Sequence, residues 1–185
     1  IISPGINFMS ILNLMSQIFL VMAFGNLIND FQDIETDKIS HPNRHLVLGT
    51  ITFKETKKIL SVLVLLIIAV SISFNIQANL FLYVIILPLL TFYNKIFKSI
   101  PLLGNIVIAF LLSSIFIFTE LLLTGGFSVL YFPCILIFSL SFIREFLKDI
   151  QDYKGDFMSQ INTLPVYIGK QRSINVAVIF ILCFV

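Results

Sequence analysis

Two short stretches of this 185-residue chain concentrate acidic and amide side chains at one repeated spacing. In the first stretch these side chains belong to Asn26, Asp30, Asp33 and Asp37, and in the second to Glu145, Asp149, Asp152 and Asp156. Each residue of the second set stands 119 positions after its counterpart in the first. On a helix, steps of four, three and four residues place side chains along one stripe. The two stripes therefore indicate an internal repeat, with both copies facing one shared site.

Carboxylates about one helical turn apart suit Mg²⁺, which prefers hard oxygen ligands and is usually held by one or two carboxylates together with substrate phosphates. The carboxylates of both stripes are therefore candidate ligands of Mg²⁺. Basic residues stand beside both stripes, and those predicted to bind substrate are Arg44, Lys98, Arg144 and Lys148. Acids and bases interleaved beside apolar runs predict a site for Mg²⁺ and for the diphosphate of a substrate with an apolar tail.

The predicted site implies a reaction. Mg²⁺ and the bases would stabilise diphosphate as a leaving group, an allylic carbocation would form in a dry pocket, and a second substrate would trap it. The residues predicted to be catalytic are Asp33, Asp37, Asp152 and Asp156.

The rest of the chain has the composition of an integral membrane protein. Its mean hydropathy is +1.01, with 58% hydrophobic and only 12% charged residues, and a soluble domain of this length would expose too much apolar surface. Cys134 and Cys183 lie within apolar runs and have no partner at metal-ligand spacing, so we interpret them as small hydrophobic residues. We expect the lipid bilayer, and no nucleic acid, as a partner.

Apolar runs predict the elements that position the two stripes. The runs cover residues 8–28, 59–74, 80–93, 102–123 and 127–142, and a sixth begins at residue 174. About 20 apolar residues suffice for a helix to cross a bilayer. Pro88 predicts a kink in the third run. The predicted fold class is therefore all-α, a polytopic transmembrane helix bundle.

The charges lie on one side of this bundle. If successive runs cross in alternate directions, loops 29–58, 94–100 and 144–173 share one side and hold all twelve Lys and Arg and nine of the ten Asp and Glu. Only Glu120 falls at the opposite end. The positive-inside rule assigns the charged side to the cytoplasm, so both acidic stripes are predicted to lie on the cytoplasmic face of a multi-pass protein.

At these residues the sequence resembles the UbiA family of intramembrane prenyltransferases. The family signature NDxxDxxxD is matched by Asn29, Asp30, Asp33 and Asp37, and the signature DxxDxxGD by Asp149, Asp152, Gly155 and Asp156. The similarity extends to residues 100–105, 144–148 and 162–165, and so covers essentially the whole chain.

The resemblance implies nine transmembrane helices around a central cavity, with Mg²⁺ bridging both Asp-rich motifs to a prenyl diphosphate. The metal ligands that it implies are Asn29, Asp30, Asp33, Asp37, Asp149, Asp152 and Asp156. Since five spans and the start of a sixth are counted here, residues 1–185 are predicted to be a single partial domain that lacks the first and the C-terminal helices. A Tyr-x-x-x-Lys motif of some members corresponds to Tyr93 and Lys98, which stand five residues apart instead of four. With Asn29, they complete the predicted substrate-binding residues.

Within the family, residues 100–105 and 144–149 most resemble geranylgeranylglycerol-phosphate geranylgeranyltransferases, which implies transfer of a prenyl group to a lipid hydroxyl. The alternative acceptor is an aromatic ring such as 4-hydroxybenzoate or a dihydroxynaphthoate. Two further alternatives stay open, an inactive homologue and an ion-coupled transporter. A transporter predicts acidic side chains near mid-span, whereas nine of the ten here lie at the ends or in the loops of one side.

Overall fold

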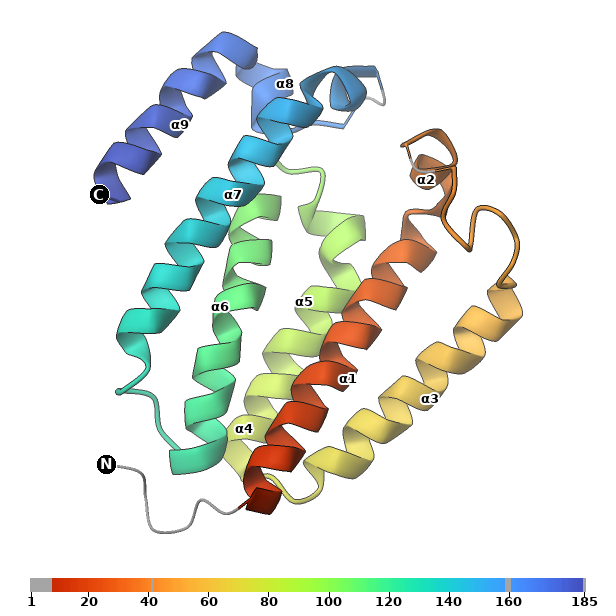
Figure 1. The fold of residues 1–185 in the computed structure, drawn as a ribbon, viewed down its shortest axis with the longest axis vertical. Coiled ribbons are helices and arrows are strands. Elements are labelled where there is room, and N and C mark those ends of the chain that lie inside the picture. Colours follow the sequence, from red (N-terminus) through yellow and green to blue (C-terminus); the bar gives the residue numbers. More distant parts are fainter. Residues whose placement is uncertain (1–7, 41, 159–160, 185) are drawn as a thin grey trace. The chain divides into compact units, whose positions relative to one another are not determined.

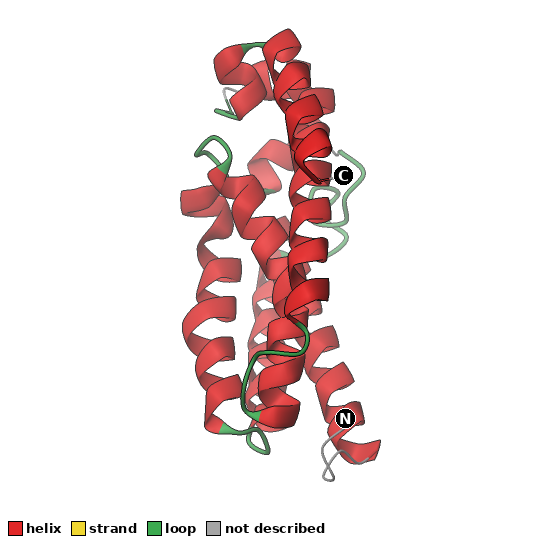
Figure 2. Cartoon of the chain, turned by 90° about the vertical axis from the view of Figure 1, so that its left-hand side faces the viewer, coloured by secondary structure: helices red, strands yellow, loops and turns green. Residues whose placement is uncertain are grey.

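The structure, a computed structural model, describes residues 8–40, 42–158 and 161–184. Within these residues the chain forms helices joined by short loops and contains no strand, as Figure 2 shows. The predicted all-α fold class is therefore confirmed. In chain order the elements are α1 (Phe8–Gln32), α2 (Ile34–Ser40), α3 (Phe53–Ser71), α4 (Ile76–Leu80), η1 (Phe81–Ile86), α5 (Leu87–Phe92), η2 (Tyr93–Phe97), α6 (Leu103–Thr124), α7 (Tyr131–Met158), α8 (Leu164–Ile168) and α9 (Lys170–Phe184) (Figure 1).

Helices occupy each of the predicted apolar runs. Three of them in the described part of the chain are long and apolar enough to cross a membrane, namely α1, the continuous segment Ile76–Phe97 and α6. Their large apolar side chains are often exposed, for example Phe19 at 71% and Val84 at 65%. Such surface is suited to lipid and is unfavourable in water. That α3, α7 and α9 also cross the membrane stays a prediction.

The chain divides into two compact units. Unit 1 comprises Ile1–Thr91 and Ile115–Tyr131, and unit 2 comprises Phe92–Ser114 and Phe132–Val185. Each unit carries one acidic stripe, the first at the end of α1 and in α2, the second on α7. That residues 1–185 form a single partial domain stays a prediction.

In unit 1, α1 packs along α3, and the two helices lie side by side in Figure 1. A capping box begins α3. The Glu55 N–H donates to the Thr52 hydroxyl at 3.2 Å, and the Thr52 N–H donates to the Glu55 carboxylate at 2.8 Å. Two backbone donors that a helix start leaves unpaired are thereby satisfied.

In unit 2, α7 is one continuous helix that carries the second acidic stripe along its last turns. Phe146 and Ile150 of α7 are buried together with Ala177 of α9. The Phe180 ring of α9 packs edge-on against Phe146, with ring centroids 5.6 Å apart. This apolar contact holds the stripe-bearing end of α7 against α9.

The segment around Pro88 contains π-helical turns, and the predicted kink at Pro88 stays a prediction. The segment Ile76–Phe97 changes from α-helix to π-helix at Phe81–Ile86 and again at Tyr93–Phe97. Pro88 has no backbone N–H to donate, and its ring crowds the carbonyl one turn earlier. We attribute the wider turn before Pro88, in which the Leu87 N–H donates to the Leu82 carbonyl, to this crowding.

The fifth apolar run begins differently from the expectation. Residue 127 was expected to start a helix, but α7 begins at Tyr131. The intervening N–H groups of Ser128, Val129 and Leu130 donate instead to the Glu120 carboxylate of α6, at 2.7, 2.7 and 2.8 Å. Glu120, the one acidic residue away from the charged side, thus closes the loop between α6 and α7. Its side chain is only 3% exposed.

We expect Glu120→Ala to lower the unfolding temperature of the complete protein in detergent, because three backbone donors would lose their charged acceptor. Glu120→Gln should lower it less, since one amide oxygen can still accept. Circular dichroism during heating measures this, with Glu35→Gln as a control that changes an exposed carboxylate. If Glu120→Ala melts like the control, the loop does not depend on this carboxylate.

Candidate functional site

The first acidic stripe follows a helical path that bends at Asp33. The Asp33 N–H donates to the Asn29 carbonyl at 2.9 Å, and the Asp37 N–H donates to the Asp33 carbonyl at 2.8 Å. These bonds keep the four-residue helical spacing from α1 into α2. Helical hydrogen bonds thus continue through the stripe, with a bend at Asp33 that the spacing did not indicate. That these side chains share one face stays a prediction.

Two residues between the acids hold this stretch in place. The Phe31 ring packs edge-on against Phe53 of α3 at 5.8 Å, and the Lys57 ammonium lies 6.0 Å from the Phe31 ring centroid. The Gln32 amide donates to the Thr91 carbonyl of α5 at 3.0 Å. The helical repeat thus divides the stretch, so that Phe31 and Gln32 make packing contacts and the acids occupy a different face.

Arg44 joins two acids of the first stripe. One guanidinium nitrogen, Nη1, donates to Asp30 at 2.7 Å and to Asp37 at 2.6 Å. The Asp37 side chain is 7% exposed, whereas those of Arg44 and Asp30 are 37% and 43% exposed. A carboxylate as buried as Asp37 requires such a cationic partner. The Asn29 amide also donates to Asp33 at 3.3 Å, so contacts within unit 1 join Arg44 to Asp30 and Asp37, and Asn29 to Asp33.

The second stripe lies on the last turns of α7, as its spacing predicted. The Asn105 amide, near the start of α6, donates to the Asp149 carboxylate at 2.8 Å. The Thr163 hydroxyl, from the loop before α8, donates to Asp156 at 3.2 Å. Asp152 is exposed. The sequence did not indicate that Asn105 and Thr163 contact these acids, although Asn105 is a polar residue near the start of an otherwise apolar run.

Burial raises the pKa of Asp149 to about 6, and the neighbouring Asp156 and Glu145 add to the shift. The hydrogen bond from Asn105 and the charge of Lys148 oppose this rise. Burial likewise raises the pKa of Asp156, which the Thr163 hydrogen bond and the charges of Lys98 and Lys148 oppose. Unit 2 therefore gathers two predicted substrate-binding lysines, Lys98 and Lys148, around two predicted metal ligands.

The extra residue between Tyr93 and Lys98 is accommodated by a π-helical turn. Residues Tyr93–Phe97 form η2, in which the Lys98 N–H donates to the Tyr93 carbonyl at 3.0 Å. In a π-helix, residues five apart are one turn apart, as residues four apart are in an α-helix. The pair therefore keeps the one-turn relation of the Tyr-x-x-x-Lys pattern despite the longer spacing.

The predicted substrate ligand Arg144 pairs with its neighbour in the sequence instead of with a predicted metal ligand. Its side chain is 70% exposed and forms an ion pair with the adjacent Glu145. Within the described residues, no three His, Cys, Asp or Glu side chains converge closely enough to hold a metal by themselves. Mg²⁺ does not require three, because it retains water and phosphate oxygens beside one or two carboxylates.

Comparison with known proteins decides the family. The model of the UbiA prenyltransferase family matches residues 3–185. This chain belongs to the UbiA family. Together with the apolar helices, membership marks it as a membrane protein, as its composition predicted.

Several relatives of this UbiA chain share one name. The digeranylgeranylglyceryl phosphate synthase of Methanococcus aeolicus is 38% identical over 90% of this chain and 58% of its own length. The enzyme of the same name from Methanocaldococcus jannaschii is 34% identical over 83% of this chain and 54% of its own length. This chain therefore spans somewhat more than half the length of these relatives.

Solved structures share the fold of this UbiA chain. A structure described as digeranylgeranylglyceryl phosphate synthase aligns with a TM-score of 0.74 at 32% identity, over 97% of this chain and 63% of that one. A UbiA homologue from Archaeoglobus fulgidus, solved with DMAPP and Mg²⁺, aligns with a TM-score of 0.81 at 19% identity. That alignment covers 99% of this chain and 66% of the other. The UbiA-like helical fold is thereby confirmed.

We expect Asn105→Leu to raise the pKa of Asp149 above about 6. The hydrogen bond from Asn105 stabilises the ionised carboxylate, and the substitution removes it. Infrared titration of protonated carboxyl groups in metal-free detergent measures the change. Ser113→Ala serves as the control in α6, since the Ser113 hydroxyl donates only to the Phe110 carbonyl of its own helix. An unchanged or lowered pKa in Asn105→Leu contradicts the assigned effect of Asn105.

Proposed function

We propose that this chain is part of an Mg²⁺-dependent prenyltransferase that moves a prenyl group from a prenyl diphosphate to a lipid hydroxyl. The observation that carries this proposal is the pair of acidic stripes, each accompanied by basic side chains at the charged end of apolar helices. Membership of the UbiA family and the shared name of the relatives support the same reaction class.

The residues present suit Mg²⁺. Their donor atoms are carboxylate and amide oxygens, the hard ligands that this ion prefers. We propose that Asn29, Asp30, Asp33, Asp37, Asp149, Asp152 and Asp156 hold it, and that Asp33, Asp37, Asp152 and Asp156 are the catalytic members of this set. When bound, Mg²⁺ supplies a Lewis acid that neutralises charge on the departing diphosphate.

The basic residues complete the diphosphate site in this proposal. The buried Asp37 carboxylate orients the Arg44 guanidinium, which can bind phosphate oxygens. Lys98 and Lys148 add positive charge beside Asp156, and Tyr93 lies one turn from Lys98. Arg144 and Asn29 are further substrate ligands in the proposal, although Arg144 must first leave its pairing with Glu145. Apolar helices exclude water from the carbocation that forms.

The proposed acceptor is a lipid hydroxyl such as that of geranylgeranylglyceryl phosphate. Its support is the name of the relatives, which are 31–38% identical to this chain. The alternative, an aromatic acceptor, is distinguished by the transfer assay described below. We also propose that the site lies on the cytoplasmic face of the membrane, because the loops at the charged end hold all twelve Lys and Arg.

We expect Asp33→Ala and Asp152→Ala in the complete protein each to lower prenyl transfer at least about a hundredfold, because each removes a proposed oxygen ligand of the metal. The amount of protein inserted into the membrane should not change. Glu35→Ala is the matched control, since Glu35 lies in the same stretch and pairs with the exposed Lys38 instead. Full activity in either Asp variant would remove the metal-site proposal.

A transfer assay on membranes that contain the complete protein tests the reaction itself. With radiolabelled geranylgeranyl diphosphate and geranylgeranylglyceryl phosphate, we expect product with Mg²⁺ and a loss of product with EDTA. Product only with 4-hydroxybenzoate or a dihydroxynaphthoate would keep the prenyltransferase and replace the acceptor. No product with any acceptor, despite correct insertion, would favour an inactive homologue or a transporter.

A further inference from the structure

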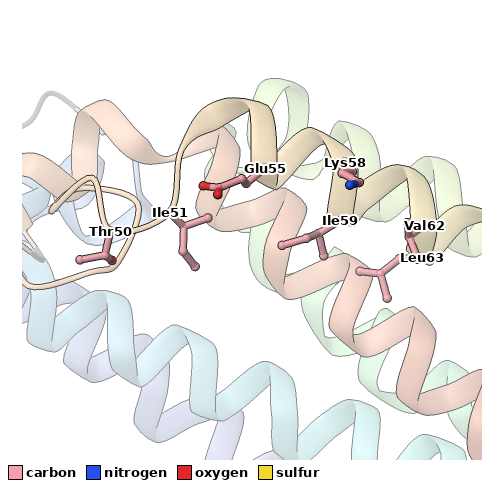
Figure 3. Close-up of a pocket in the computed structure, with 7 residues that line it drawn as sticks. All are labelled: Thr50, Ile51, Glu55, Lys58, Ile59, Val62 and Leu63. Carbon is pink, nitrogen blue, oxygen red and sulfur yellow. The ribbon is translucent and has the colours of Figure 1, made fainter.

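A groove runs along the start of α3, and none of the predicted metal ligands lines it. It has a volume of about 510 Å³ and lies wholly within unit 1. Ile51, from the loop before α3, lines it together with Glu55, Lys58, Ile59, Val62 and Leu63 of the helix (Figure 3). In Figure 3 the side chains of Ile51, Ile59 and Leu63 point to the same side. The groove is therefore a built feature of one helix and the loop that precedes it.

The lining changes in character along the helix. Lys58 stands one turn after Lys54, and both lie at the charged end. Ile59 and Val62 follow, and they remain 43% and 46% exposed. Leu66, one turn beyond Val62, is 45% exposed. From Lys58 to Leu66 the helix rises about 12 Å at about 1.5 Å per residue, passing from positive charge to continuous apolar surface.

The positive charge of this end is available to a ligand. The Glu55 carboxylate accepts from the N–H and from the hydroxyl of Thr52, both at 2.8 Å, so it serves to cap the helix. The ammonium of Lys57 lies against the Phe31 ring. In the described part of the chain, neither Lys54 nor Lys58 forms an ion pair.

We propose that this groove binds an anionic membrane phospholipid. Lys58 and Lys54 pair with the phosphate of its headgroup, and its hydrocarbon chain lies on Ile59, Val62 and Leu63. The ammonium groups of lysine side chains reach toward the headgroup region while their methylene stems stay on apolar surface. Basic sites beside membrane helices select anionic headgroups because opposite charges attract. This lipid is bound and is not consumed, so the proposal goes beyond prenyl transfer and does not depend on it.

The test measures the phospholipid that stays bound to the complete protein. The protein is reconstituted in nanodiscs of phosphatidylcholine containing phosphatidylglycerol, extracted into detergent, and analysed by native mass spectrometry. One lysine beside a membrane surface contributes about 1 kcal/mol to binding of anionic lipid, which corresponds to about fivefold in affinity. We therefore expect Lys58→Gln and Lys54→Gln each to lower retained phosphatidylglycerol about fivefold.

Two matched controls separate the groove from general surface effects. Lys170→Gln removes the same charge at an exposed position of α9 and should leave retention unchanged. Val62→Trp fills the groove and should lower retention, whereas Leu65→Trp adds the same ring at a 66% exposed position outside the lining and should not. Circular dichroism checks that all variants are equally folded.

Three results would overturn the proposal. The first is equal retention in Lys58→Gln and Lys170→Gln, which would mean that surface charge alone retains the lipid. The second is unchanged retention in Val62→Trp. The third is a photoreactive residue at position 59 that crosslinks to another segment of the protein instead of to phospholipid.

Discussion

A carboxylate at the end of an apolar helix is stable only where a donor or a cation faces it, and this constraint recurs throughout the molecule. Asp37 is compensated by the Arg44 guanidinium, Asp149 by the Asn105 amide, and Glu120 by three backbone N–H groups. The partners differ because their surroundings differ. A partly exposed side-chain cation such as Arg44 can exchange its carboxylate partners for a ligand, whereas the N–H groups that bind Glu120 are part of the loop itself.

Helical periodicity allows one stretch to pack and to carry chemistry at the same time. At the end of α1, Phe31 and Gln32 contact α3 and α5, and the acids before and after them lie on another face. On α7, Phe146 and Ile150 are buried against α9, and Asp149 of the stripe lies between them in the sequence. In each unit the packing residues thus fix the helix end that carries the acids. The spacing between neighbouring acids of one stripe is therefore set by the helix.

The π-helical turns show how the backbone absorbs a change in spacing. The turn at Phe81–Ile86 precedes Pro88, and the turn at Tyr93–Phe97 places Tyr93 one turn from Lys98. A widened turn costs some helical stability, and such turns are frequent at functional sites. Here the second one retains the register between an aromatic hydroxyl and a lysine ammonium that a regular α-helix would have lost.

The sequence by itself determined the class of the fold, the run of apolar helices and the two acidic stripes, because hydropathy and the helical repeat are local properties of the chain. It also placed Arg44 near the acids of the first stripe, with two of which it forms ion pairs. Only the tertiary structure decided that Asn105 is the partner of Asp149, 44 residues away, and that Glu120 closes a loop where a helix start was expected. It also decided that a π-helical turn relates Tyr93 to Lys98 and that α3 and its preceding loop form a groove. The contacts of Asn105 and Glu120 join separate segments, and their free energy comes from burial and hydrogen-bond geometry that no local pattern of residues specifies.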